Sequence, residues 1–155
     1  MRGKQAPKRQ IEPDYKYNNV QIAKFTNYLM DSGKKSTAFG IIYGCLDLIS
    51  QKTKRDPLEM FETAMRNVGP SVEVRGKRIG GANYQIPFPV RNERRFNLAS
   101  KWIIEAAKKR KGHSMAEKLS AELIDAANEL GEAFKKKADV HRQAEANRAF
   151  AHFAR

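Results

Sequence analysis

The sequence is poor in the residues that build covalent or metal-bound frameworks. Among 155 residues there is one cysteine, Cys45, and there are three histidines, which lie far apart. A single cysteine excludes an internal disulfide and any zinc site that is built from several cysteines. The histidines do not follow a metal-ligand spacing, so we expect no metal and no cofactor. Cys45 lies in an apolar helical stripe, which favours packing in the core over catalysis.

Long apolar runs are also missing. No run approaches the length that crosses a bilayer, and no signal-peptide core follows the basic N-terminus. No expected helix combines a basic face with a strongly apolar one, as helices that lie on membranes do. We therefore expect a protein without a membrane partner. The single cysteine fits a reducing, cytosolic compartment.

The groups needed for catalysis do not converge. An active site needs neighbouring groups of tuned acidity, yet the histidines are scattered and the carboxylates concentrate on one expected helix face. Gly76, Gly80 and Gly81 lie within one basic segment and not between a strand and a helix, so they form no dinucleotide fingerprint. The sequence predicts that the protein is not an enzyme.

Acidic residues are too few to balance the basic ones. The chain has 30 Lys and Arg against 17 Asp and Glu, which gives a net charge of +13. Self-repulsion of that size opposes a compact fold, so a polyanionic partner is expected to offset it. With membranes disfavoured, nucleic acid is the favoured partner.

The segment 72–90 is predicted to be a β-hairpin. Apolar residues alternate at Val72 and Val74, and they alternate again from Tyr84 to Val90. The middle is rich in glycine and basic residues, so the hairpin has a cationic tip that suits a nucleic-acid groove. Pro87 and Pro89 lack an N–H group at alternate positions, which is typical of an edge strand and discourages a wider sheet.

Helical periodicity dominates the rest of the chain. We expect a mainly α fold: a single domain of about six helices with one protruding β-hairpin between the third and fourth helices. The expected parts are a basic N-terminal arm (1–19), a helical body (20–146) and a basic, aromatic C-terminal tail (147–155). The expected helices cover about residues 20–31, 37–53, 57–68, 92–109, 115–130 and 132–146. Ser36, Asp56 and Ser114 precede three of them and are predicted to be their N-caps.

Several features allow two interpretations. The arm could order on phosphate or stay a solvated tail. The cations at the end of the fourth helix could stabilise that helix through its dipole, or they could form part of a basic binding surface. Trp102 could anchor the body or stack on a base. The tail aromatics Phe150 and Phe153 could stack on RNA or dock onto the body. The acidic side of the fifth helix, which includes Glu122, is expected to face solvent or a basic protein.

Specific motifs carry a family resemblance. They are GKKSTA at 33–38, VEV at 72–74, RIGG at 78–81, YQIP at 84–87, the pair Arg94-Arg95, WI at 102–103, EAA at 105–107 and AEANRAFAH at 144–152. With them, nearly the whole chain resembles the bacterial-type small-subunit ribosomal proteins of the S-seven family.

The resemblance implies a function and a set of partners. Members of this family bind the 3′ major domain of small-subunit ribosomal RNA directly and nucleate assembly of the subunit head. They lie near the exit site for transfer RNA and near messenger RNA, beside small-subunit proteins of the S-nine and S-eleven families. The implied location is the ribosome, in a bacterial cytoplasm or as an organelle-encoded copy. The alternative is a basic DNA- or RNA-binding regulatory module outside the ribosome, which would need a recognition helix with base-reading side chains.

The family's binding residues carry over to positions of this sequence. The predicted ribosomal-RNA contacts are Arg2, Lys4, Lys8, Arg9, Lys34, Lys35, Arg75, Lys77, Arg91, Arg94, Arg95, Lys108, Lys109, Arg110 and Lys111. The predicted transfer-RNA contacts, at the hairpin tip and on the last long helix, are Arg78, Gly80, Gly81, Asn83, Tyr84 and Arg142.

Overall fold

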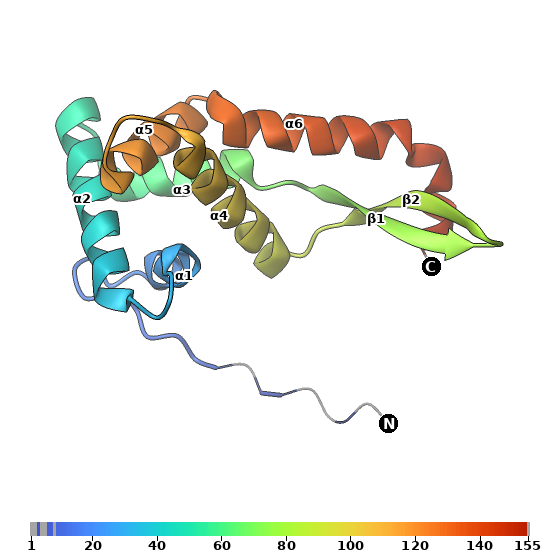
Figure 1. Ribbon diagram of the computed structural model, residues 1–155, viewed down its shortest axis with the longest axis horizontal. Coiled ribbons are helices and arrows are strands. Elements are labelled where there is room, and N and C mark those ends of the chain that lie inside the picture. The colour runs from blue at the N-terminus through green and yellow to red at the C-terminus, as the bar shows by residue number, and fades with distance from the viewer. Residues whose placement is uncertain (1–2, 4–5, 8, 155) are drawn as a thin grey trace. The chain divides into compact units, whose positions relative to one another are not determined.

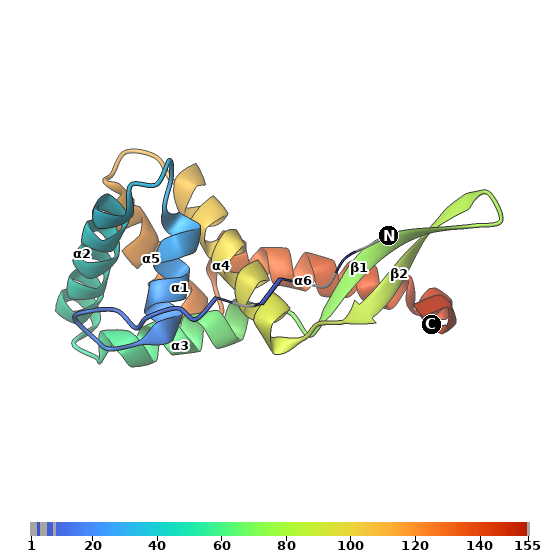
Figure 2. The ribbon, with the colours of Figure 1, turned by 90° about the horizontal axis from the view of Figure 1, so that it is seen from below.

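The computed structural model describes residues 3, 6–7 and 9–154, and the predicted contacts Arg2, Lys4 and Lys8 lie outside this part. The chain divides into two compact units, residues 1–40 and 41–155. The described residues hold six α-helices, one 3₁₀ helix and a two-stranded hairpin (Figures 1 and 2). In chain order the elements are α1 (Val20–Leu29), α2 (Lys35–Thr53), α3 (Pro57–Val68), β1 (Val72–Ile79), β2 (Ala82–Pro89), α4 (Asn92–Lys109), α5 (Met115–Ala127), α6 (Gly131–Ala146) and η1 (Arg148–Ala154). The mainly helical fold class with its hairpin between the third and fourth helices is confirmed.

The first unit shows local order that the sequence prediction missed. Asp14 is 2% exposed, and its carboxylate accepts hydrogen bonds from the backbone N–H groups of Lys16 and Tyr17 at 3.1 and 2.9 Å. Such a turn is a known preference of aspartate. The last residues of the expected arm therefore form a defined turn that leads to the cap of α1, where the Asn19 side chain accepts from the Gln21 N–H at 2.7 Å.

The start of α2 differs from the expectation. Ser36 was predicted to cap this helix from outside, but the helix begins one residue earlier, at Lys35. The connection turns at Ser32 and Gly33, whose φ angles are 50° and 74°. Because the turn is complete by Gly33, the helical hydrogen bonds begin before Ser36, with the Ala38 N–H donating to the Lys34 carbonyl.

In the second unit, the predicted helix caps are present. The Asp56 side chain accepts from the Leu58 N–H at the start of α3, and Ser114 accepts from the Glu117 N–H at the start of α5. Both interactions satisfy backbone donors that a helix N-terminus otherwise leaves without a partner. The short polar residues therefore set where these two helices begin.

The core of this unit lies where α3, α4 and α5 pack on one another, and α6 runs out from them alongside the hairpin (Figure 1). Val68, Ile103 and Leu119 are each at most 1% exposed. Cys45 is also 1% exposed, and burial raises the pKa of its thiol to about 12. The preference for core packing over catalysis at Cys45 is therefore supported.

The hairpin has the predicted geometry. Val72 pairs with Pro89 and Ile79 with Ala82, and the turn between them uses Gly80 and Gly81 at φ angles of 58° and 89°. Two successive positive φ angles match the type I′ turns that suit two-residue hairpins.

The edge role of the two prolines follows from the hydrogen-bond alternation. The Val90 N–H donates to the Ser71 carbonyl at 2.9 Å, next to the paired strands. Because N–H groups along an antiparallel strand alternate between the partner and the free edge, Pro87 and Pro89 occupy positions that face the free edge. Neither proline removes a hydrogen bond of the hairpin.

His141 ties α6 to the start of the hairpin segment. Its Nε2 accepts a hydrogen bond from the backbone N–H of Ser71 at 3.2 Å. Burial lowers the pKa of His141, and the nearby charges of Lys137 and Arg95 lower it further. The imidazole is therefore held in its neutral form, which is the form that can accept this bond.

Acidification is expected to destabilise the protein through His141. The unfolded chain takes up this proton at about pH 6.5, whereas the folded chain takes it up only at lower pH. The contribution of His141 is thus present above this pH and is lost as the pH falls through it. When the pH is lowered from about 7.5 to 5, we expect His141→Gln, whose amide oxygen can still accept from Ser71, to lose less stability than the wild type, because glutamine takes up no proton. Urea unfolding across this range measures the difference, and identical pH profiles for the two proteins would contradict it.

Candidate nucleic-acid interface

Three predicted RNA contacts converge on one groove at the base of the hairpin. This cavity of about 600 Å³, here called the arginine groove, is lined by Glu73, Arg75, Phe88, Pro89, Val90, Arg91 and Arg94. Arg91 is the N-cap residue of α4, Arg94 lies in the first turn of that helix, and Arg75 comes from β1. The hairpin therefore brings together cations that are up to 19 residues apart in the sequence.

The arginines of the groove are held in defined positions. The guanidinium of Arg75 lies over the Phe88 ring, 5.4 Å from its centroid, and also bonds to the Glu73 carboxylate. Arg94 bonds to the other oxygen of the same carboxylate at 3.2 Å. Burial opposes ionisation of Glu73, but the hydrogen bonds and charges of the two arginines outweigh it and hold its pKa below the usual range. The groove is therefore a set of fixed charges at neutral pH.

The predicted transfer-RNA contacts divide into two groups. Arg78, Gly80, Gly81 and Asn83 are exposed at the hairpin tip, as expected. Tyr84 lies against η1 instead, because its ring centroid is 5.1 Å from that of Phe150 and 5.9 Å from that of Phe153.

The tail therefore docks on the hairpin. Lys77, which pairs with Tyr84 across the two strands, reaches the same tail and donates from Nζ to the Phe153 carbonyl at 3.0 Å. Of the two interpretations of the tail aromatics, docking is the one that the structure shows. Arg142 is exposed on α6, 3.7 Å from Asp139, and lines a second cavity beside the hairpin base.

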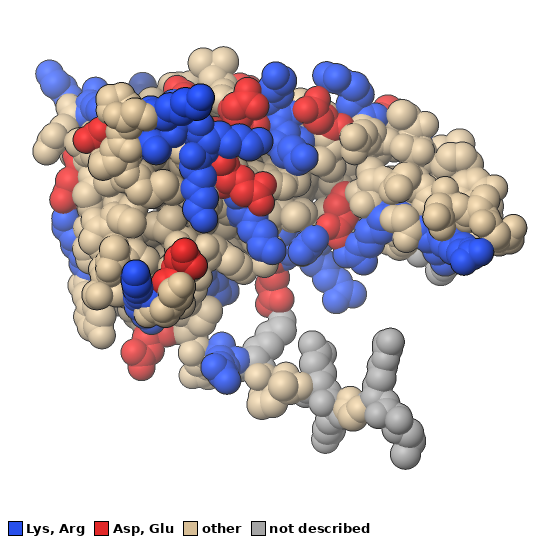
Figure 3. All heavy atoms as spheres, viewed as in Figure 1, with Lys and Arg blue, Asp and Glu red and all other residues tan. Residues whose placement is uncertain are grey.

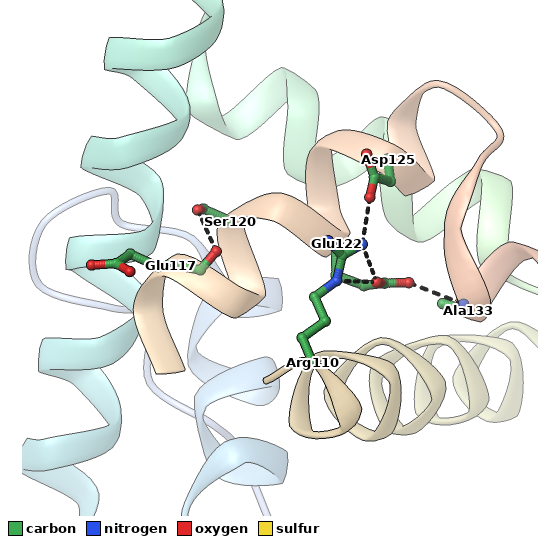
Figure 4. Close-up of polar contacts among 6 residues, drawn as sticks. All are labelled: Arg110, Glu117, Ser120, Glu122, Asp125 and Ala133. Atoms are coloured by element: carbon green, nitrogen blue, oxygen red, sulfur yellow. Dashed lines mark hydrogen bonds and ion pairs between the residues drawn. The ribbon is translucent and has the colours of Figure 1, made fainter. Parts of the chain in front are cut away.

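Arg110 forms ion pairs with carboxylates of the protein itself (Figure 4). Its guanidinium reaches from the end of α4 to α5, where it contacts Glu122 at 2.6 Å and also Asp125. Glu122 is 1% exposed, and its second oxygen accepts from the Ala133 N–H at the start of α6 at 3.0 Å. The expectation that Glu122 faces solvent is wrong, because this carboxylate joins three helices.

Arg95 is also used internally. Its Nε donates to the Gly69 carbonyl at 3.1 Å and its Nη2 to the Arg66 carbonyl at 3.2 Å, so it satisfies the C-terminal end of α3. A side chain at Gly69 would lie only 2.7 Å from Arg95 Nε, so glycine makes room for this contact. Lys137 adds a second cation at this end by donating to the Asn67 carbonyl at 2.7 Å.

The other predicted cations are exposed. Lys34 and Lys35 lie at the start of α2, but their own backbone N–H groups donate to the carbonyls of Asp31 and Gly33. Phosphate binding at this helix start would therefore depend on the lysine side chains, not on these two amides. The remaining exposed cations are Arg9, Lys108, Lys109 and Lys111.

Trp102 lies in a shallow cavity between α4 and α6 and is only half-buried. The cavity of about 300 Å³ is also lined by Lys109, Lys135 and Lys136, together with three carboxylates. Trp102 therefore lies between two helices of the body, with part of its side chain open to solvent. Sequence reasoning missed this cavity because the α4 and α6 residues meet only through the fold.

Basic side chains spread over one face of the molecule. Figure 3 shows Lys and Arg side chains over α4 and α6 and along the hairpin, with Asp and Glu between them. In the described part of the chain, no helix is both long and apolar enough to cross a membrane. Across those same residues, no group of three His, Cys, Asp or Glu side chains is placed to hold a metal ion.

A helical body that displays arginines in a groove beside a basic hairpin defines the class of small nucleic-acid-binding proteins. Comparison with known proteins is more specific. The family model described as "Ribosomal protein S7p/S5e" matches residues 1–148. The small ribosomal subunit protein uS7 of Caldanaerobacter subterraneus is 57% identical over 147 residues, covering 95% of this chain and 94% of its own. The uS7 proteins of Polynucleobacter asymbioticus and Dechloromonas aromatica are 55% and 53% identical, each covering 98% of this chain and 97% of its own.

The chain belongs to the ribosomal protein S7p/S5e family. It is accordingly a structural, non-enzymatic constituent of the small ribosomal subunit, located with the ribosome in the cytoplasm.

Proposed function

We propose that this protein binds the 3′ major domain of small-subunit ribosomal RNA directly and that the arginine groove is a principal contact. The convergence of Arg75, Arg91 and Arg94 on one cavity carries the proposal. Guanidinium groups suit phosphate because they present several donors in a planar fork. Binding of this kind works through charge neutralisation and shape, and it needs no chemical step.

The proposal extends to the rest of the basic surface. The net charge of +13 is offset when the chain is buried in RNA, which supports a role in nucleating assembly of the subunit head. The exposed tip around Arg78 and Asn83 is proposed to face exit-site transfer RNA and nearby messenger RNA. Proteins of the S-nine and S-eleven families are proposed as neighbours.

The internal contacts refine the predicted set of RNA-binding residues. Arg110 is neutralised by Glu122 and Asp125, and Arg95 is bonded to the end of α3. We propose that these two arginines stabilise the fold, whereas the three groove arginines bind the RNA.

Replacing the three groove arginines with glutamine is expected to weaken binding to a transcript of the 3′ major domain about 30-fold. Glutamine removes the charge but keeps a donor for Glu73. The slope of log affinity against log salt should flatten by about 2 units, since each phosphate contact contributes about 0.7–0.9. A salt titration with this transcript and with a shuffled RNA of equal length measures both quantities.

The matched control removes the same charge elsewhere. Three other cations are exposed and lie outside the groove: Lys52, Arg55 and Arg66. Changing all three to glutamine should lower RNA affinity much less, and by the same factor for both RNAs. Equal losses from the two triple variants would argue against the groove. If the wild type did not prefer the transcript to the shuffled RNA, the regulatory DNA- or RNA-binding alternative would be favoured.

A further inference from the structure

One acidic residue lies within the arginine groove. Glu73 belongs to β1 and is the one carboxylate among the described residues that line this cavity. Its side chain is 10% exposed, whereas those of Arg75 and Arg94 are 58% and 47% exposed. The carboxylate is therefore at the floor of the groove, and the arginines extend from it toward solvent.

The two oxygens of Glu73 hold one arginine each. Oε1 accepts from Arg75 through Nε, at 2.7 Å, and through Nη2. Oε2 accepts from the Nε of Arg94 at 3.2 Å. A guanidinium has five N–H groups, so each contact occupies only one edge of the arginine. The Phe88 ring beneath Arg75 fixes the plane of that guanidinium as well.

Two opposite effects on a phosphate ligand follow from this arrangement. The negative charge of Glu73 repels phosphate, but solvent and two counter-charges screen it. Against this, an arginine that is already held in place loses less conformational freedom on binding, which is worth about two- to tenfold in affinity for each long side chain. With two arginines ordered by one shielded carboxylate, the ordering effect is the larger one.

We propose that Glu73 is a positioning residue of the arginine groove, which orders Arg75 and Arg94 for phosphate and so strengthens the binding of a polyanion. This inference rests on the proposed function. Because the arginines keep the pKa of Glu73 low, the carboxylate is ionised throughout the neutral range.

The test is a double-mutant cycle on binding to the 3′ major domain transcript. Simple charge counting predicts that Glu73→Gln raises affinity, since it removes a negative charge. We expect it instead to lower affinity about three- to tenfold. In a background that already carries Arg75→Gln and Arg94→Gln, no guanidinium is left for Glu73 to order. There we expect Glu73→Gln to raise affinity slightly.

Glu62→Gln is the matched control. Glu62 is exposed on α3, outside the groove, and its replacement should raise affinity slightly in both backgrounds. Circular dichroism melting of every variant reports whether the fold is kept. If Glu73→Gln lowers RNA affinity in the wild type but raises it in the double arginine variant, a general loss of structure cannot be the cause.

Other outcomes overturn the inference and are separable from failure of the proposed function. If Glu73→Gln strengthened binding in the wild type as Glu62→Gln does, Glu73 would only repel RNA. Equal weakening in both backgrounds would show that Glu73 does not act through the arginines. If the double arginine variant bound the transcript as tightly as the wild type, the groove itself would not bind RNA, and the proposed function would fail first.

Discussion

Replacing Glu122 with alanine is expected to lower the free energy of unfolding by about 3–5 kcal/mol, although it removes a negative charge from a very basic protein. Glu122 is 1% exposed, and its carboxylate bonds both to Arg110 and to the Ala133 N–H. Alanine would leave a partly buried guanidinium with only Asp125 and would remove the acceptor of a buried amide. Both losses carry a desolvation cost.

Urea unfolding followed by circular dichroism measures this loss. Glu122→Gln should lower the free energy of unfolding less than Glu122→Ala does, because an amide oxygen can still accept from the Ala133 N–H. Glu62→Ala is the control, since Glu62 is exposed on α3, and it should change stability by less than about 0.5 kcal/mol. A Glu122→Ala protein as stable as this control would show that the three-helix junction does not depend on the carboxylate.

Removing the two tail aromatics with Phe150→Ala and Phe153→Ala is expected to loosen the outer half of the hairpin. Both rings lie against Tyr84, and the tail also receives the Lys77 hydrogen bond. A two-stranded hairpin is only marginally stable by itself in water. Loss of two aromatic contacts and their buried area should lower the local opening free energy by about 3 kcal/mol, or roughly 100-fold in exchange rate.

Amide hydrogen exchange measures this effect residue by residue. The amides of Lys77 and Tyr84 should exchange faster in the variant, while those in α3 and α5 should keep their protection. Ala151→Ser provides the control, because Ala151 is exposed on the same 3₁₀ helix. Unchanged protection of the hairpin would mean that the tail covers it without stabilising it.

Local features of the fold were predictable because their causes are local. The caps Asp56 and Ser114 each act on a backbone amide two or three residues ahead. The hairpin follows from alternation and from Gly80-Gly81, which supply the two positive φ angles of its turn. Such signals need no knowledge of distant partners.

What sequence reasoning missed involves partners far along the chain. Glu122 looked like part of a solvated acidic face until the structure brought it to Arg110 and to the start of α6. Arg95 looked like its neighbour Arg94, yet one bonds to the end of α3 and the other lines the groove. A one-residue difference in helical position separates a structural cation from a proposed RNA contact, and charge composition cannot resolve that difference.

The buried cysteine makes the protein a convenient object for thiol labelling. With its pKa raised to about 12, Cys45 holds almost no thiolate at neutral pH, so the folded chain resists alkylation and disulfide-linked dimers. A cysteine placed at the exposed tip, for example by Arg78→Cys, would be the only reactive thiol and could carry a spectroscopic probe without removal of the native one. Conversely, modification of Cys45 itself reports the opening of the core that surrounds it.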